Sequence, residues 1–217
     1  MLALAAVPAR ADDWVINMTV DNQFDCYFGT PFSTNFLAGS GNNWSNTYTF
    51  NALGRLPTDY LYVATSSDQN VAQGMIGTFA NTTTNMTTDT GDLVWEVFPA
   101  GQYLQQMGLG NGPWPPSLQP TQAQVDIAIN YAETNGLWVT PVAGGFNGVA
   151  PWGTRPGISN NARWIWHSAN GDPDPTSPGF NHDEFLVFRI AGAVPAPGAV
   201  SLLSLAAVGL MRRSRAK

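Results

Sequence analysis

The sequence predicts an all-β protein, a two-sheet sandwich of the jelly-roll type, in a chain of 217 residues. Short stretches of β-branched and aromatic residues recur along the chain, and several alternate apolar with polar positions. Gly- and Asn-rich segments separate these stretches, as turns separate strands. Only 11% of the residues are charged and 12% are aromatic, so the chain has ample apolar surface to bury and little charge to oppose collapse.

The first predicted strand, WVINMTV at residues 14–20, alternates apolar and polar side chains. The DNQ sequence after it is a turn signal, and FDCYF then begins a partner strand. Cys26 is the only cysteine, so no intramolecular disulfide forms, and it is expected to be a small buried apolar residue. On their buried faces the two strands are expected to carry Trp14, Ile16, Met18 and Val20, and then Phe24, Cys26 and Phe28.

Later segments have the composition of further short strands. In RWIWH, Trp164 and Trp166 are two residues apart and are therefore expected on one inner face. Residues 81–91 are so polar that we expect a loop or the edge of a strand. The remaining strands are expected at residues 47–50, 59–65, 74–79, 93–98, 163–167 and 184–190.

One segment, PTQAQVDIAINYAETNG at residues 120–136, has the pattern of a helix. Thr121 is suited to cap its beginning and Gly136 to end it. The sandwich is therefore expected to contain one short helical insert. Its apolar face is expected to consist of Val125, Ile129 and Ala132.

The C-terminal segment has a different character. No charged residue occurs from Gly198 to Met211, and a helix of these fourteen residues would be roughly 21 Å long, against roughly 30 Å for the hydrocarbon core of a bilayer. Basic residues behind such a run stay in the cytoplasm, which would place residues 12–194 outside. The alternative, a terminal apolar helix packed on the domain, lacks the polar face that such a helix needs. The basic cluster consists of Arg212, Arg213, Arg215 and Lys217.

A short proline motif, an apolar span and an arginine cluster follow one another from Val194 to Arg215. This tail resembles the PEP-CTERM sorting signal of Gram-negative bacteria, which exosortase-type membrane enzymes process. Ala196 stands where that family usually has Glu, so the motif matches a Val-Pro-Ala-Pro variant. The resemblance implies an anchor in the inner membrane through the tail, and then delivery to the cell surface or extracellular matrix. The residues that carry it are Val194, Pro195, Ala196, Pro197, Arg212, Arg213 and Arg215.

The N-terminal segment, MLALAAVPARA, ends in an A-x-A sequence at Ala9 and Ala11 that is typical of signal-peptide cleavage. The basic region and half of the apolar stretch of a signal peptide are missing. Either the start codon is assigned too late, or the segment is a short unstructured leader. The chain is thus expected to divide into a signal-peptide remnant at 1–11, a β-sandwich domain at 12–193 and the sorting tail at 194–217.

The order of strand and turn segments over residues 14–191 resembles a galactose-binding-like β-sandwich of the type seen in bacterial and algal surface proteins. The resemblance does not extend to residues 101–145, and it implies a fold more than a ligand, because this fold hosts many functions. The matching positions are Asp21, Phe24, Tyr27, Gly29, Gly41, Trp44, Val63, Gly74, Trp95, Trp152, Gly153, Trp164, Trp166 and Arg189.

The charge distribution excludes one class of partner. Between Asp12 and Pro197 the chain has fifteen acidic residues, four arginines and no lysine, a net charge of −11. Because binding to nucleic acid requires a basic face that neutralises phosphates, no nucleic-acid partner is expected.

The sequence also lacks the usual catalytic motifs. It contains no nucleophile elbow, phosphate loop or zinc-ligand spacing, and its two histidines, His167 and His182, are fifteen residues apart. We therefore expect a non-catalytic protein. The alternatives are a secreted glycoside-hydrolase-like enzyme, which needs two carboxylates facing a cleft, and a purely structural matrix protein.

Two kinds of binding residue are expected in the loops. In the turn GSGNNW, Asn42 and Asn43 offer amides and Trp44 offers a flat ring, a combination that suits a polysaccharide. Calcium is a candidate cofactor, because hard cations take carboxylate and amide oxygens from loops. Its candidate ligands are Asp21, Asp172 and Asp174. The other tryptophans in strand patterns, Trp14, Trp95, Trp164 and Trp166, are expected in the core.

Overall fold

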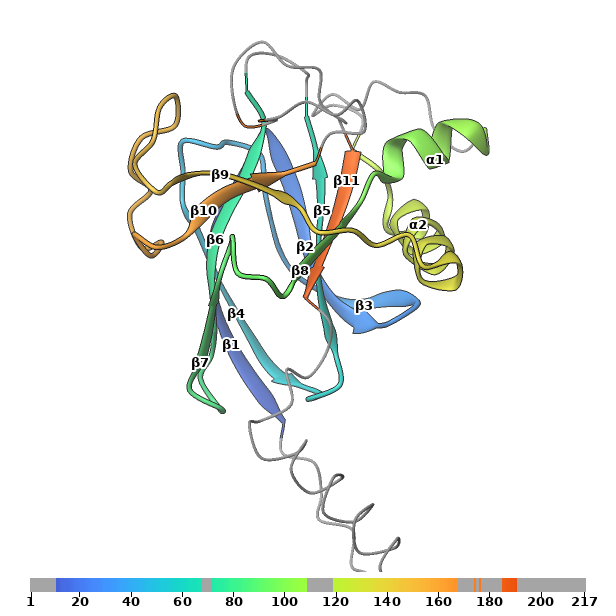
Figure 1. Cartoon of the computed structure of the whole chain (residues 1–217). Coiled ribbons are helices and arrows are strands. Elements are labelled where there is room, and N and C mark those ends of the chain that lie inside the picture. The colour runs from blue at the N-terminus through green and yellow to red at the C-terminus, as the bar shows by residue number, and fades with distance from the viewer. Residues whose placement is uncertain are drawn as a thin grey trace, which may run out of the picture.

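The computed structural model describes residues 11–67, 72–108, 119–167, 174, 176 and 185–190. Two antiparallel sheets lie face to face, which confirms the predicted β-sandwich (Figure 1). The first sheet has the strand order β4-β1-β6-β10-β9, with β7 also paired to β6, and the second has the order β3-β2-β5-β11-β8. The strands are β1 (Asp12–Asp21), β2 (Gln23–Thr30), β3 (Ser33–Gly41), β4 (Tyr48–Arg55), β5 (Tyr60–Ser66), β6 (Gly74–Asn81), β7 (Met86–Asp89), β8 (Trp95–Phe98), β9 (Val142–Phe146), β10 (Arg163–Trp166) and β11 (Phe185–Ile190).

The sandwich has two distinct ends. Asp12 pairs with Arg55 and Ile190 pairs with Leu61, so β1 begins and β11 ends beside the turn that joins β4 to β5. We call this the terminal end. At the opposite, distal end, β3 leads through residues 42–47 into β4, which begins at Tyr48. Because β4 has eight residues, the two ends are roughly 26 Å apart along this strand.

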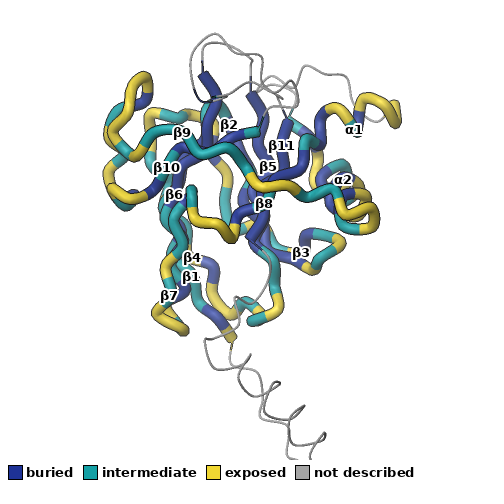
Figure 2. Tube along the Cα trace, in the orientation of Figure 1, coloured by how far each residue is buried: buried dark blue, intermediate teal, exposed yellow. Residues whose placement is uncertain are grey.

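The main core lies between the two sheets (Figure 2). The alternation predicted for β1 and β2 is confirmed, although Trp14 at the start of β1 is only half-buried. The predicted turn between them is a single residue, Asn22, where the chain passes from the first sheet to the second. The side chains that the two strands bury in the core are Ile16, Met18, Val20, Phe24, Cys26 and Phe28.

The expectation that Trp164 and Trp166 share one inner face was wrong. Both are fully buried, but Trp166 lies in the main core, 5.7 Å from Phe188 between ring centroids. Trp164 instead stacks on Trp152 at 4.1 Å and 18°, in a separate cluster. The pairing of β10 with β9 changes register between Arg163 and Ile165, and such an irregularity breaks the alternation of faces along a strand.

The outer face of the second sheet is covered by two helices, α1 (Ala100–Gln106) and α2 (Gln122–Asn135) (Figure 1). The predicted helix is confirmed as α2: Thr121 and Gln124 form a reciprocal capping box, and Gly136 ends the helix at a φ of 63°. The second helix, α1, was not expected. Pro99 precedes it without a capping side chain, so the sequence lacks the usual signal of a helix start.

Three strands fall outside the sequence expectations in different ways. Strands β3 and β9 were not predicted, because each carries two glycines that interrupt the apolar pattern. For the polar stretch 81–91 we expected either a loop or the edge of a strand. This stretch contains β7, which pairs with β6.

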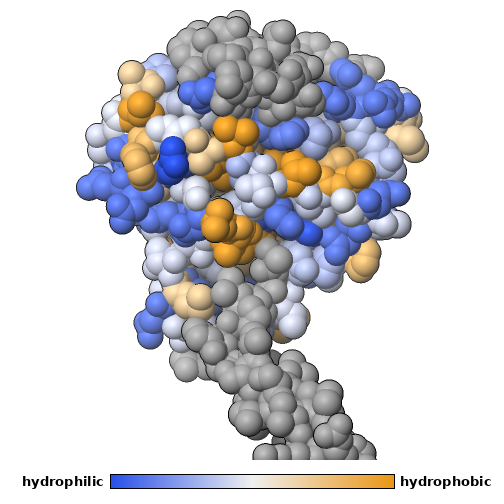
Figure 3. Space-filling view, viewed as in Figure 1, coloured by the Kyte–Doolittle hydropathy of each residue, from blue (hydrophilic) through white to orange (hydrophobic). Residues whose placement is uncertain are grey.

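Apolar side chains form several patches among polar ones on the face shown in Figure 3. Leu93 is 93% exposed, and Leu53 and Phe146 are more than half exposed. Within the described ranges, no helix is long and apolar enough to cross a membrane. Ala9 and the whole tail at 194–217 lie outside the described residues, as does the expected C-terminal apolar helix.

Candidate functional site

The predicted binding turn lies at the distal end and is ordered by its own side chains. Asn42 and Asn43 are exposed, and the backbone N–H of each donates to the hydroxyl of Tyr48 at 3.1 Å. The side-chain oxygen of Asn43 accepts hydrogen bonds from Ser45, at 3.0 Å from its backbone N–H and 2.7 Å from its hydroxyl. This local bonding is an Asx turn, which an asparagine can form without help from the rest of the protein.

Trp44 in this turn has a packing role. Its ring is half-buried and packs against the cluster that contains Trp152 and Trp164. The guanidinium carbon of Arg155 lies 5.4 Å from the centre of the ring. The backbone carbonyl of Trp44 accepts from Thr19 Oγ1 at 3.1 Å and from Arg155 Nη1 at 3.2 Å. The structure thus brings all three predicted residues into one turn, but it leaves the amides more accessible than the indole.

A shallow groove of about 630 Å³, largely open to solvent, lies at this turn. Tyr48 forms a rigid part of its wall, because its ring stacks on Phe50 at 6.3 Å and meets Phe24 edge-on at 5.5 Å. The lining combines hydroxyl, amide and backbone groups and contains no charged side chain. The lining residues are Ser45, Asn46, Thr47, Tyr48, Thr49, Pro156 and Gly157.

Arg155 joins the two walls of the groove. Its Nη1 donates to the carbonyl oxygens of Trp44 and Ser45, and its Nη2 donates to that of Trp152 at 2.6 Å. Asn147 holds the backbone of Arg155 at both ends, since its Oδ1 accepts from the Arg155 N–H at 2.7 Å and its Nδ2 donates to the Arg155 carbonyl at 3.1 Å. Sequence reasoning missed Arg155, because it lies in a loop without periodicity, 111 positions from Trp44.

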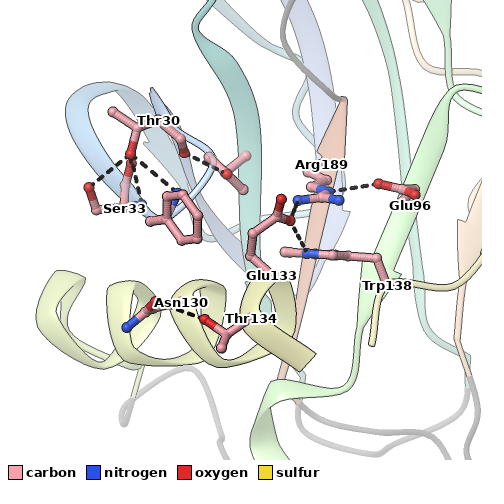
Figure 4. Close-up of polar contacts among 10 residues, drawn as sticks. Thr30, Ser33, Glu96, Asn130, Glu133, Thr134, Trp138 and Arg189 are labelled. Atoms are coloured by element: carbon pink, nitrogen blue, oxygen red, sulfur yellow. Dashed lines mark hydrogen bonds and ion pairs between the residues drawn. The ribbon is translucent and has the colours of Figure 1, made fainter. Parts of the chain in front are cut away.

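A second polar cluster ties α2 to the second sheet (Figure 4). Arg189 is almost fully buried, and its Nε lies 2.7 Å from a carboxylate oxygen of Glu96 while its Nη1 bonds to Glu133. Trp138 lies over the guanidinium at 4.0 Å and donates its indole N–H to Glu133 at 3.1 Å. Both carboxylates of this cluster are bound to the same arginine.

The candidate calcium ligands that the structure describes have hydrogen-bond donors as partners. Asp21 accepts a hydrogen bond from the indole of Trp152 at 2.9 Å, and Asp174 accepts from the backbone N–H of Thr176 at 3.1 Å. Asp172 lies outside the described residues. Among those residues, no three His, Cys, Asp or Glu side chains are grouped so that they could hold a metal ion.

No protein-family model, curated protein or solved structure matches this chain.

Proposed function

We propose that the protein is an exported, non-catalytic component of the cell surface or extracellular matrix that binds polysaccharide in the distal groove. In this proposal the sandwich is of the galactose-binding-like type. The tail at 194–217 is a PEP-CTERM-type sorting signal that anchors the protein in the inner membrane until an exosortase-type enzyme processes it.

The observation that carries the binding proposal is the chemistry of the groove. Its hydroxyls, amides and carbonyls can both donate to and accept from sugar hydroxyls, and Pro156 and the edge of Tyr48 offer apolar surface. The turn that forms one wall is already ordered by its own hydrogen bonds, so little conformational entropy is lost on binding. Affinities near millimolar are expected, because a few such hydrogen bonds barely exceed the cost of association.

The position of the groove supports the same function. The chain leaves the sandwich at Ile190, at the terminal end, and the apolar tail follows in sequence. The groove lies at the distal end, roughly 26 Å away along β4. A protein anchored by its tail would therefore present the groove away from the membrane.

A glycan array probed with the full chain, with and without calcium, tests the binding proposal. A glycan selected on the array is then titrated against Asn46→Ala, which removes an amide from the groove, and against Asn51→Ala, an exposed control on β4 outside the lining. We expect Asn46→Ala to weaken binding about three- to tenfold, the value of about one hydrogen bond, and Asn51→Ala to leave it unchanged. Binding to no glycan would favour a purely structural role, and equal loss in both variants would place the site elsewhere.

A further inference from the structure

Arg155 places a positive charge beside the groove, in a domain that is acidic overall. A guanidinium has five N–H groups, and three of those on Arg155 are directed at the carbonyl oxygens of Trp44, Ser45 and Trp152. Its Nε is buried and has no hydrogen-bond partner among the residues that the structure describes. Within the described residues no carboxylate lies within 4.0 Å of its nitrogen atoms. The partners of the guanidinium there are the three carbonyl groups and the Trp44 ring, and the residue is partly exposed to solvent.

The lining of the groove does not neutralise that charge either. None of its residues is acidic, and Ser45, which lines it, accepts from Arg155 through its carbonyl at 2.7 Å. The positive charge thus lies one residue behind the groove wall. Residues 12–197 as a whole carry a net charge of −11, which disfavours the approach of anions to the domain.

We propose that the polysaccharide bound at the groove is acidic, with carboxylate or sulfate groups, and that Arg155 supplies the charge that selects it. This inference rests on the proposed function of the groove. An acidic sugar placed there would bring a full negative charge toward an arginine whose partners among the described residues are neutral. Its neutral counterpart would gain only the hydrogen bonds.

The test compares ligands that share a backbone and differ in charge. The protein is titrated with oligogalacturonate and with its neutral methyl ester, and then with a sulfated galactan and with its desulfated form. The first pair tests recognition of a carboxylate and the second tests recognition of a sulfate. We expect the charged member of at least one pair to bind about five- to tenfold more tightly at low salt. That preference is expected to shrink as the salt concentration rises, because the charge lies close to solvent.

Two variants assign the preference to one residue. Arg155→Met is expected to abolish the preference for the charged ligand while the neutral ligand still binds. Arg163→Met is the matched control, because Arg163 also lies over an aromatic ring, Phe146, and donates to a backbone carbonyl. If Arg155→Met fails to fold, the comparison of charged and neutral ligands on the wild-type protein still tests the inference.

Three outcomes overturn the inference. They are equal binding of charged and neutral ligands, tighter binding of the neutral ones, and a preference that persists in a folded Arg155→Met variant. In each of these cases the groove still binds polysaccharide and the proposed function survives. If neither the charged nor the neutral ligands bind, the proposed function fails together with the inference.

Discussion

Arg189 of β11 and Glu133 of α2 form an ion pair that links the helical layer to the second sheet. Burial disfavours the charge on Arg189, but hydrogen bonds to Glu133 and Glu96 outweigh it and raise the pKa of the guanidinium. The side chain of Arg189 is 8% exposed, whereas Glu133 is 25% and Glu96 38% exposed. Because Arg189 is the most buried of the three side chains, its charge depends most on the other two for stabilisation.

Removing Glu133 should destabilise the protein more than removing Glu96. Glu133→Ala deprives the buried Arg189 of one charge and Trp138 of its acceptor, and we expect a loss of about 1–3 kcal/mol in the free energy of unfolding. Glu96→Ala should cost less, because Glu96 is the more exposed partner. Urea denaturation of the two variants measures both values. An equal or reversed order would contradict the role assigned to Glu133.

The stacked pair of Trp152 and Trp164 should give an exciton-coupled circular dichroism signal, because at 4.1 Å between ring centroids the transition dipoles of the two indoles couple strongly. Trp152→Phe and Trp164→Phe should each remove this signal. Trp14→Phe is the control, since Trp14 contacts Phe28 and no other indole in the described residues. Survival of the signal in either of the first two variants would show that the pair is not stacked in solution.

Gly74 gives a second test of the same cluster. A Cβ at this position would lie 2.7 Å from the Trp164 ring and 3.3 Å from that of Trp152. We expect Gly74→Ala to cost about 1–3 kcal/mol through overpacking and to weaken the exciton signal.

The matched control for that substitution is Gly54→Ala. The added Cβ at Gly54 would meet nothing within 4 Å, but the residue has a φ of +67°. Its cost should therefore be backbone strain of about 1–2 kcal/mol with the exciton signal unchanged. If both variants alter that signal, overpacking at Gly74 is not the cause.

Cys26 should be unreactive in the folded protein. It is fully buried in the main core, and burial together with the charge of Asp25 raises the pKa of its thiol well above the usual range. We expect no alkylation by iodoacetamide at pH 8 under native conditions, and one label per chain after unfolding in urea. Mass spectrometry measures both states, and rapid labelling of the native protein would contradict the burial.

The sorting proposal predicts the location of the protein in its own host. When it is exported through a signal peptide of the host, the full chain should be found in the membrane fraction before processing, because its apolar run precedes an arginine cluster. Deletion of residues 195–217 should release the protein into the periplasm or medium. Recovery of the full chain as a soluble cytoplasmic protein would refute the proposal.

Local signals in the sequence were enough to predict some of the elements. Alternation in residues 14–20 identified β1 and its buried face, and Thr121 with Gly136 identified both ends of α2. Such signals are reliable because a few consecutive residues determine the buried face of a strand and the cap of a helix.

The contacts between distant segments became clear only from the three-dimensional structure. It separated Trp164 from Trp166 through a change of register against β9, and it placed α1 on the second sheet without a capping residue. It also brought Arg155 beside Trp44 and made one groove from two loops. The physical reason is that these contacts depend on the packing of whole sheets, whereas periodicity and capping report only on neighbours in sequence.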